Sequence, residues 1–209
     1  MRLPIFSRLR WLFLASLVAA VALWLAYGRM PAHGVPPAAE LDDFCVVAPP
    51  TPYDPKSGRD PLVPRPVPAD ARCPVCGMFP ARSPEWAAQV IFSNGDAQFF
   101  DSPLTLFIYL QDVGRYSIGR QANEIAASYV NDADRAGWIR TTDAFYVHGS
   151  NALGPMRLGN LPAFSSAAGA LRFARVRGGA VLRASEIKPP LLHTLMVPRR
   201  HAHTEQARE

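Results

Sequence analysis

Eleven of the chain's 21 prolines lie between Met30 and Ala71, and no other feature constrains the fold as strongly. Proline fixes φ and removes a backbone donor, so a segment this rich in proline resists both helix and sheet. We therefore expect residues 31–70 to form a semi-rigid, extended linker. The folded part of the 209-residue chain should then begin near Ala71.

The segment before the linker is typical of a membrane anchor. Arg2, Arg8 and Arg10 precede an uncharged apolar run from Trp11 to Tyr27. At about 1.5 Å per residue such a helix just crosses a bilayer core, and the basic flank holds its start in the cytoplasm. The run is long for a signal peptide and lacks a clean cleavage site close after it. We predict an uncleaved anchor over residues 1–30, with a single pass through a bacterial inner membrane and the remaining chain in the periplasm.

A motif with two thiols and a thioether follows the linker. It consists of Arg72-Cys73-Pro74-Val75-Cys76-Gly77-Met78-Phe79-Pro80. Pro74 and Gly77 favour a turn, which would let Cys73 and Cys76 converge on one atom. Thiolates and thioethers are soft ligands that select Cu(I) over harder ions, so Met78 favours copper.

Other uses of the two cysteines stay open on spacing alone. Structural zinc usually takes four Cys or His ligands, and the chain has only one further cysteine, Cys45. In an oxidising compartment Cys73 and Cys76 could form a plain disulfide, with Met78 as packing. A thioredoxin-type site normally follows a strand and opens a helix, whereas this motif follows prolines.

The chain after the motif has the pattern of a small α+β domain. Residues 87–92 and 97–100 read as strands around a tight turn at 93–96. Asp101-Ser102-Pro103 supplies an N-cap and a first-turn proline for a helix that Gly114 closes. Residues 125–130 read as a third strand.

A second segment repeats this plan. Strands are expected at 144–148 and 161–164, a capped helix at 167–177 and a closing strand at 180–183. We interpret the pattern as two repeated small ββαβ units, 71–140 and 141–190, followed by a flexible tail over 191–209.

Met156 is the second candidate thioether. It lies in the turn-rich loop after the strand at 144–148, and the packing of two repeats could bring it toward Cys76 and Met78. His148 reads as a half-buried strand residue, whereas His201 and His203 lie in the polar tail. The predicted metal ligands are therefore Cys73, Cys76, Met78 and Met156.

Composition excludes several classes of function. The net charge of +5 comes mostly from arginines that are scattered along the chain, and no basic and aromatic alternation marks a nucleic-acid surface. Asp101, Asp96 and Glu85 each have a structural role as cap, turn residue or surface charge. No Ser/His/Asp set, phosphate loop or carboxylate pair indicates an enzyme.

A series of motifs between about Ala71 and Ile187 carries a resemblance to a known family. The motifs are Cys73-Pro74-Val75-Cys76-Gly77-Met78, Phe99-Phe100-Asp101-Ser102-Pro103, Tyr129-Val130-Asn131-Asp132, Trp138-Ile139, Tyr146-Val147, Gly154-Pro155-Met156 and Gly178-Gly179-Ala180-Val181-Leu182. In this order they resemble the NosL family, the accessory proteins of nitrous oxide reductase maturation. The chain departs from the family at its N-terminus, where members are commonly lipoproteins and this sequence has no lipobox.

The resemblance implies an exported Cu(I) metallochaperone with a duplicated ββαβ architecture. Its implied partners are apo nitrous oxide reductase, in which a copper-sulfide centre is assembled, and an ABC-type membrane maturation complex. The family's metal-binding pattern matches Cys76 and Met78, with Cys73 beside them and Met156 in the second repeat. Two alternatives remain: a periplasmic thiol-disulfide oxidoreductase that uses Cys73 and Cys76, and a structural adaptor that holds them as a disulfide.

Overall fold

The computed structural model describes residues 23, 48–157 and 160–196. The chain divides into two compact units, Met1–Phe44 and Cys45–Glu209, and every strand that the structure describes lies in the second unit. The expected membrane anchor lies outside the described residues, apart from Leu23. Among the residues described, no helix combines the length and the apolar character that crossing a membrane requires.

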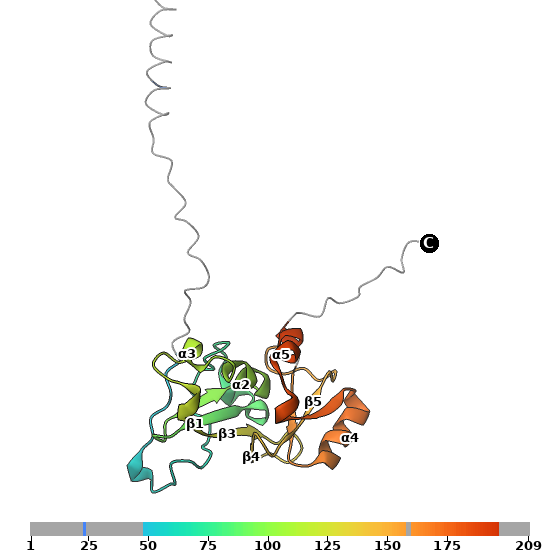
Figure 1. Ribbon diagram of the computed structural model, residues 1–209, viewed down its shortest axis with the longest axis horizontal. Coiled ribbons are helices and arrows are strands. Elements are labelled where there is room, and N and C mark those ends of the chain that lie inside the picture. The colour runs from blue at the N-terminus through green and yellow to red at the C-terminus, as the bar shows by residue number, and fades with distance from the viewer. Residues whose placement is uncertain (1–22, 24–47, 158–159, 197–209) are drawn as a thin grey trace, which may run out of the picture. The chain divides into compact units, whose positions relative to one another are not determined.

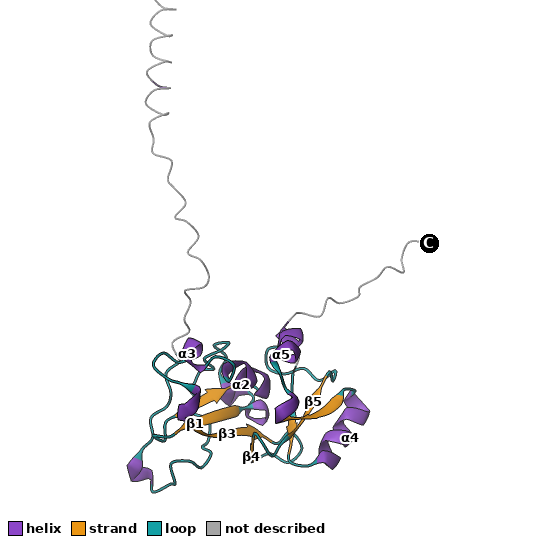
Figure 2. Cartoon of the chain, viewed as in Figure 1, coloured by secondary structure: helices purple, strands orange, loops and turns teal. Residues whose placement is uncertain are grey.

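A four-stranded antiparallel sheet forms the first half of the domain (Figure 2). Its strands are β1 (Ala88–Phe92), β2 (Ala97–Phe100), β3 (Ile125–Asn131) and β4 (Trp138–Arg140), in the order β2-β1-β3-β4. The first three agree with the predicted strands to within one residue. β4 was not predicted, because three residues are too few to display an alternating pattern.

Two short helices connect β2 to β3. Ser102 caps α2 (Pro103–Tyr109), and its side chain accepts a hydrogen bond from the backbone N–H of Thr105. The expected single helix up to Gly114 is wrong, because α2 ends at Tyr109, with Leu110 as its C-cap, and a new helix, α3 (Val113–Tyr116), begins after Asp112. Asp112 caps α3 through its side chain, and this second cap was not recognised in the sequence.

The second sheet is also antiparallel and has three strands. They are β5 (Phe145–His148), β6 (Ala163–Phe164) and β7 (Ala180–Arg183), in the order β6-β5-β7. The helix α4 (Ala167–Arg177) packs against this sheet and is capped by Ser166, as expected (Figure 1). Its bounds and those of β7 match the predicted ones.

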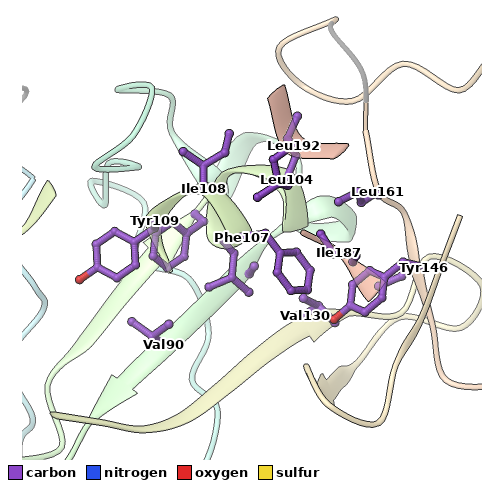
Figure 3. Packing of buried hydrophobic residues seen from close by; sticks show 14 of the residues in the cluster. Val90, Leu104, Phe107, Ile108, Tyr109, Val130, Tyr146, Leu161, Ile187 and Leu192 are labelled. Carbon is purple, nitrogen blue, oxygen red and sulfur yellow. The ribbon is translucent and has the colours of Figure 1, made fainter. Parts of the chain in front are cut away.

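One hydrophobic cluster joins the two sheets (Figure 3). The Phe107 ring of α2 meets the Tyr146 ring of β5 edge to face, with centroids 5.2 Å apart. A parallel bridge between Asp132 and Ala163 links the end of β3 to β6. Both sheets therefore depend on a shared core.

The described part of the expected linker does not extend away from the domain. Residues 48–71, here called the strap, lie against the first sheet: Thr51 pairs with Ala97, and Leu62 packs on a cluster around Phe99. The backbone N–H and C=O of Arg65 satisfy the buried amide of Gln89 at 3.0 Å each. The prolines leave the strap with a single short 3₁₀ helix, η2 (Pro55–Ser57), but they do not prevent packing.

The expected flexible tail also begins with structure. Residues Pro189–Met196 form α5, which contacts α2 and buries Leu192 and Leu195 in the shared core. Pro189 and Pro190 open this helix, where the missing N–H groups cost nothing. Residues 197–209, with His201 and His203, lie outside the described part of the chain.

Short 3₁₀ helices occupy several of the connections. They are η2 (Pro55–Ser57), η3 (Pro80–Arg82), η4 (Pro84–Trp86), η5 (Ala122–Glu124) and η6 (Ala184–Glu186). The helices η3 and η4 continue directly from the cysteine motif and lead the chain into β1.

Candidate metal site

The cysteine motif folds into a tight loop that faces the start of α2. The backbone N–H of Cys73 donates to the carbonyl oxygen of Met78, and the N–H of Gly77 donates to that of Cys73, each at 2.8 Å. Gly77 has a φ of +73°, a left-handed conformation that favours glycine. The turn expected from Pro74 and Gly77 is therefore present, and both cysteines are free thiols.

Three potential ligand atoms converge at this loop. The sulfurs of Cys73 and Cys76 and a carboxylate oxygen of Asp101 all lie within 4.8 Å of one another. Two atoms that share one ion at about 2.3 Å each are at most about 4.6 Å apart, so little movement is needed for common coordination. Among the described residues, this is the one group of three or more His, Cys, Asp or Glu side chains with such geometry.

Asp101 is almost wholly buried, with 1% of its surface exposed. Its Oδ1 accepts hydrogen bonds from the Thr105 hydroxyl at 2.7 Å and from the Cys76 thiol at 3.1 Å. Its Oδ2 is buried and has no hydrogen-bond partner in the structure. Burial of an unpaired carboxylate oxygen is costly, so this atom is the kind that a bound cation would satisfy.

The thiol environment favours the protonated form when no metal is bound. The neighbouring Cys73 thiol, followed by burial and the charge of Asp101, raises the pKa of Cys76, while the Met78 backbone opposes this shift. A reactive cysteine nucleophile requires the opposite, a lowered pKa. A cation that replaced the proton would remove this penalty, since it neutralises thiolate and carboxylate together.

The two predicted methionine ligands occupy different positions. Met78 lies at the end of the loop with 39% of its surface exposed. Met156 is half-buried and lies between β5 and β6, in a turn that is closed by the hydrogen bond from the Arg157 N–H to Gly154. The structure brings Cys73 and Cys76 together, whereas the ligand roles of Met78 and Met156 stay predictions.

Asp101 is the site residue that sequence reasoning missed, because it was assigned to capping the helix. Ser102 is the cap, and it directly precedes Pro103 at the first helical position. Since a serine next to that proline already satisfies the helix start, an adjacent aspartate had no capping role left to fill. This redundancy was the available signal for a second function.

Comparisons with known proteins agree with the observed fold. The sequence profile of the NosL family matches residues 64–192. The crystal structure of the copper chaperone NosL from Shewanella denitrificans is similar, with a TM-score of 0.53 and 22% identity, over 63% of this chain and 99% of that one. The solution structure of apo-NosL from Achromobacter cycloclastes matches with 28% identity and a TM-score of 0.37, over 50% of this chain and 87% of that one. No curated protein matches.

The matched region contains the cysteine loop, Asp101, both sheets and the first half of α5. The resemblance that the ordered motifs carry is thus confirmed, and so is the expected mixed helix and sheet class. The Shewanella protein is a copper chaperone, and at 22% identity its likeness bears on the fold of this chain alone. The profile match spans more than half of the sequence, and the chain therefore belongs to the NosL family.

Proposed function

We propose that this protein is a Cu(I) metallochaperone that carries copper at the Cys73, Cys76 and Asp101 group. The observation that carries the proposal is the convergence of two free thiols on a buried carboxylate with an unpaired oxygen. The solved relative from Shewanella denitrificans is a copper chaperone, which supports copper as the cargo.

The ligand chemistry supports Cu(I) in particular. Two thiolates are soft ligands and bind Cu(I) strongly, whereas a site for a hard ion would be dominated by oxygen. Asp101 adds charge and hydrogen bonding beside the sulfurs, so it tunes the thiolates whether or not it contacts the ion. Met78, exposed at the end of the same loop, is a soft ligand within reach of solvent.

Transfer would then proceed by ligand exchange. An incoming ligand from the recipient binds the copper ion while one ligand of this site leaves, so no redox step is needed. Because Cys76 is only partly buried and Met78 is exposed, the incoming ligand approaches from their side of the loop. Met156, in the second of the two expected ββαβ units, is a further proposed ligand.

The family resemblance supports a recipient, and the N-terminal sequence supports a location. We propose that the chain hands copper to apo nitrous oxide reductase for its copper-sulfide centre, through an ABC-type membrane complex. The apolar run from Trp11 to Tyr27 would tether it to the inner membrane, with the domain in the periplasm.

A duplication of one ββαβ unit would explain the architecture. Two strands, a helix and a strand occur in the same order in both halves, as β1-β2-α2-β3 and β5-β6-α4-β7. In each sheet the first strand of the unit is central, with the second strand on one side and the last strand on the other. The first unit has additionally acquired α3 and β4.

An anaerobic Cu(I) titration of the reduced chain against a competing chelator tests the proposed function. We expect about one tightly bound Cu(I), with binding abolished by Cys73→Ser or Cys76→Ser and weakened by Met78→Ala. Cys45→Ser is the matched control, because it removes a thiol outside the loop and should leave binding unchanged. If the unaltered chain binds no more tightly than the chelator, the carrier role is excluded, and the redox potential of Cys73 and Cys76 becomes the quantity to measure.

A further inference from the structure

Two arginines and a phenylalanine form a positively charged surface beside the candidate metal site. The guanidinium carbons of Arg72 and Arg82 lie 4.2 Å and 4.7 Å from the centroid of the Phe79 ring. Among the described residues, Phe79 is the one ring that carries two such groups. We call Arg72, Phe79 and Arg82 the arginine rim.

The rim is directly attached to the metal loop. Arg72 precedes Cys73, Phe79 follows Met78, and the Arg72 side chain donates to the carbonyl oxygen of Gly77 at 3.4 Å. Both arginines are exposed, as is Met78. The two charges therefore border the side from which an incoming ligand reaches the cysteines.

Neither rim arginine is neutralised within the described part of the chain. Arg120 pairs with Asp96 and Glu124, and Arg172 pairs with Asp134, but no carboxylate of the described residues lies within 4.0 Å of Arg72 or Arg82. Stacking on the Phe79 ring holds both guanidinium groups beside the loop, where neither has a carboxylate partner among the described residues. An anionic surface that approaches the loop would supply that partner.

We propose that the arginine rim is the docking surface for an acidic copper acceptor, a protein that surrounds its own soft ligands with carboxylates. This inference rests on the proposed function, since it assigns the electrostatic character of the partner in copper transfer. Opposite charges raise the rate of encounter and fix its orientation, while binding of the ion itself depends on the sulfurs. The rim therefore controls how fast copper leaves rather than how tightly it is held.

Two copper chelators of different charge test whether the arginine rim affects the rate of copper loss and not the affinity for copper. The full-length reduced chain, loaded with Cu(I) in non-ionic detergent, is mixed with anionic bathocuproine disulfonate or with neutral neocuproine, and copper loss is followed by absorbance. At low ionic strength we expect Arg72→Gln/Arg82→Gln to slow loss to the anionic chelator about 3- to 10-fold and to leave loss to the neutral one unchanged. The difference should fade as salt rises above about 0.1 M.

Matched variants separate charge from shape. Arg72→Lys/Arg82→Lys should retain the fast anionic rate, because the charges remain. Arg115→Gln removes an exposed arginine that lies over the Tyr116 ring on α3, and it should change neither rate. The equilibrium Cu(I) affinity of all three variants should equal that of the unaltered chain.

A macromolecular probe tests the protein character of the acceptor. Poly-L-glutamate should protect the loaded chain from bathocuproine disulfonate at low salt, and the double glutamine variant should lose this protection. Protection by phosphatidylglycerol vesicles but not by poly-L-glutamate would overturn the assignment to an acidic protein.

The remaining outcomes are also distinguishable. If the double glutamine variant and the unaltered chain lose copper to the anionic chelator at the same rate, the docking surface is overturned and the proposed function is not. If the unaltered chain does not retain Cu(I), the proposed function is overturned, and the role of the arginine rim as a docking surface is overturned with it.

Discussion

At the scale of single residues, Asp101 links the secondary structure to the chemistry. It follows β2 and precedes the cap of α2, so two elements fix its backbone. Its Oδ1 accepts a hydrogen bond from the Thr105 hydroxyl, whereas its Oδ2 has no hydrogen-bond donor in the structure. A buried carboxylate restrained in this way would stabilise a positive charge at the candidate site without reorganisation.

Asp101→Asn should weaken Cu(I) binding by about 10- to 100-fold, the usual range for groups that support metal ligands. The amide keeps the shape and can still accept from Thr105, but it removes the negative charge beside the thiols. Competition titration measures the affinity, and thermal unfolding of the copper-free variant serves as the folding control. An affinity equal to that of the unaltered chain would limit Asp101 to a structural role.

Met156→Ala should also weaken Cu(I) retention if the second unit supplies a thioether ligand. Leu153→Ala is a suitable control, because it shortens an exposed apolar side chain of the same loop. Copper loss to a chelator is compared for the two variants. Unchanged retention in Met156→Ala would remove Met156 from the ligand set.

At the scale of elements, most of the secondary structure was predictable because its signals are local. Ser166 before α4, Gly178 after it and the turn with Gly95 between β1 and β2 each depend on neighbouring residues alone. Only the cysteines of the candidate site were predictable. Cys73 and Cys76 are close in sequence, whereas Asp101 reaches them because the loop packs on the start of a helix, and no local sequence pattern predicts that packing.

The β1–β2 turn ties the strap to the first sheet. Asp96 accepts hydrogen bonds from the Tyr53 backbone and the Asn94 side chain, and it pairs with Arg120. A Cβ at Gly95 would lie 2.9 Å from the Tyr53 side chain, so the strap and the turn fit closely. Burial opposes ionisation of Asp96, but its hydrogen bonds and Arg120 outweigh burial and lower its pKa.

Asp96→Asn should lower the free energy of unfolding by roughly 1–2 kcal/mol at neutral pH. Because the folded-state pKa of Asp96 is depressed, its stabilisation is fully present above the unfolded value of about 3.9 and is lost as pH falls through the folded value. Urea unfolding at pH 7 and at decreasing pH measures the difference between the two proteins. A difference that persisted below both pKa values would show that the charge of Asp96 is not its cause.

At the scale of the whole molecule, the two sheets share one core. Tyr146 of β5, Phe107 of α2 and Leu192 of α5 belong to the same buried cluster as β1 and β3 residues (Figure 3). Sequence patterns predicted strands of both sheets, but they did not predict that the sheets share one core. A shared core depends on contacts between residues far apart in the chain. The tail prediction failed at α5 for the same reason.

Phe107→Ala should therefore destabilise both sheets together, by about 3–5 kcal/mol, as expected for a large buried aromatic. Native-state hydrogen exchange of β1 and β5 amides provides one probe for each sheet. Phe173→Ala is the control, because Phe173 lies on α4 and packs against the smaller cluster between α4 and the second sheet. It should lower the free energy of unfolding by less. Separate unfolding of the two sheets in the unaltered protein would contradict a shared core.

The strap has a mechanical consequence for a chain held by its N-terminus. Tension from that end enters the domain where Thr51 pairs with Ala97 on β2, well before the chain reaches Cys73. The contacts of Tyr53, Leu62 and Arg65 must then be peeled from the sheet in turn before any pull reaches the cysteine loop. In a chain tethered in this way, the strap would keep tension from the cysteine loop until these contacts break.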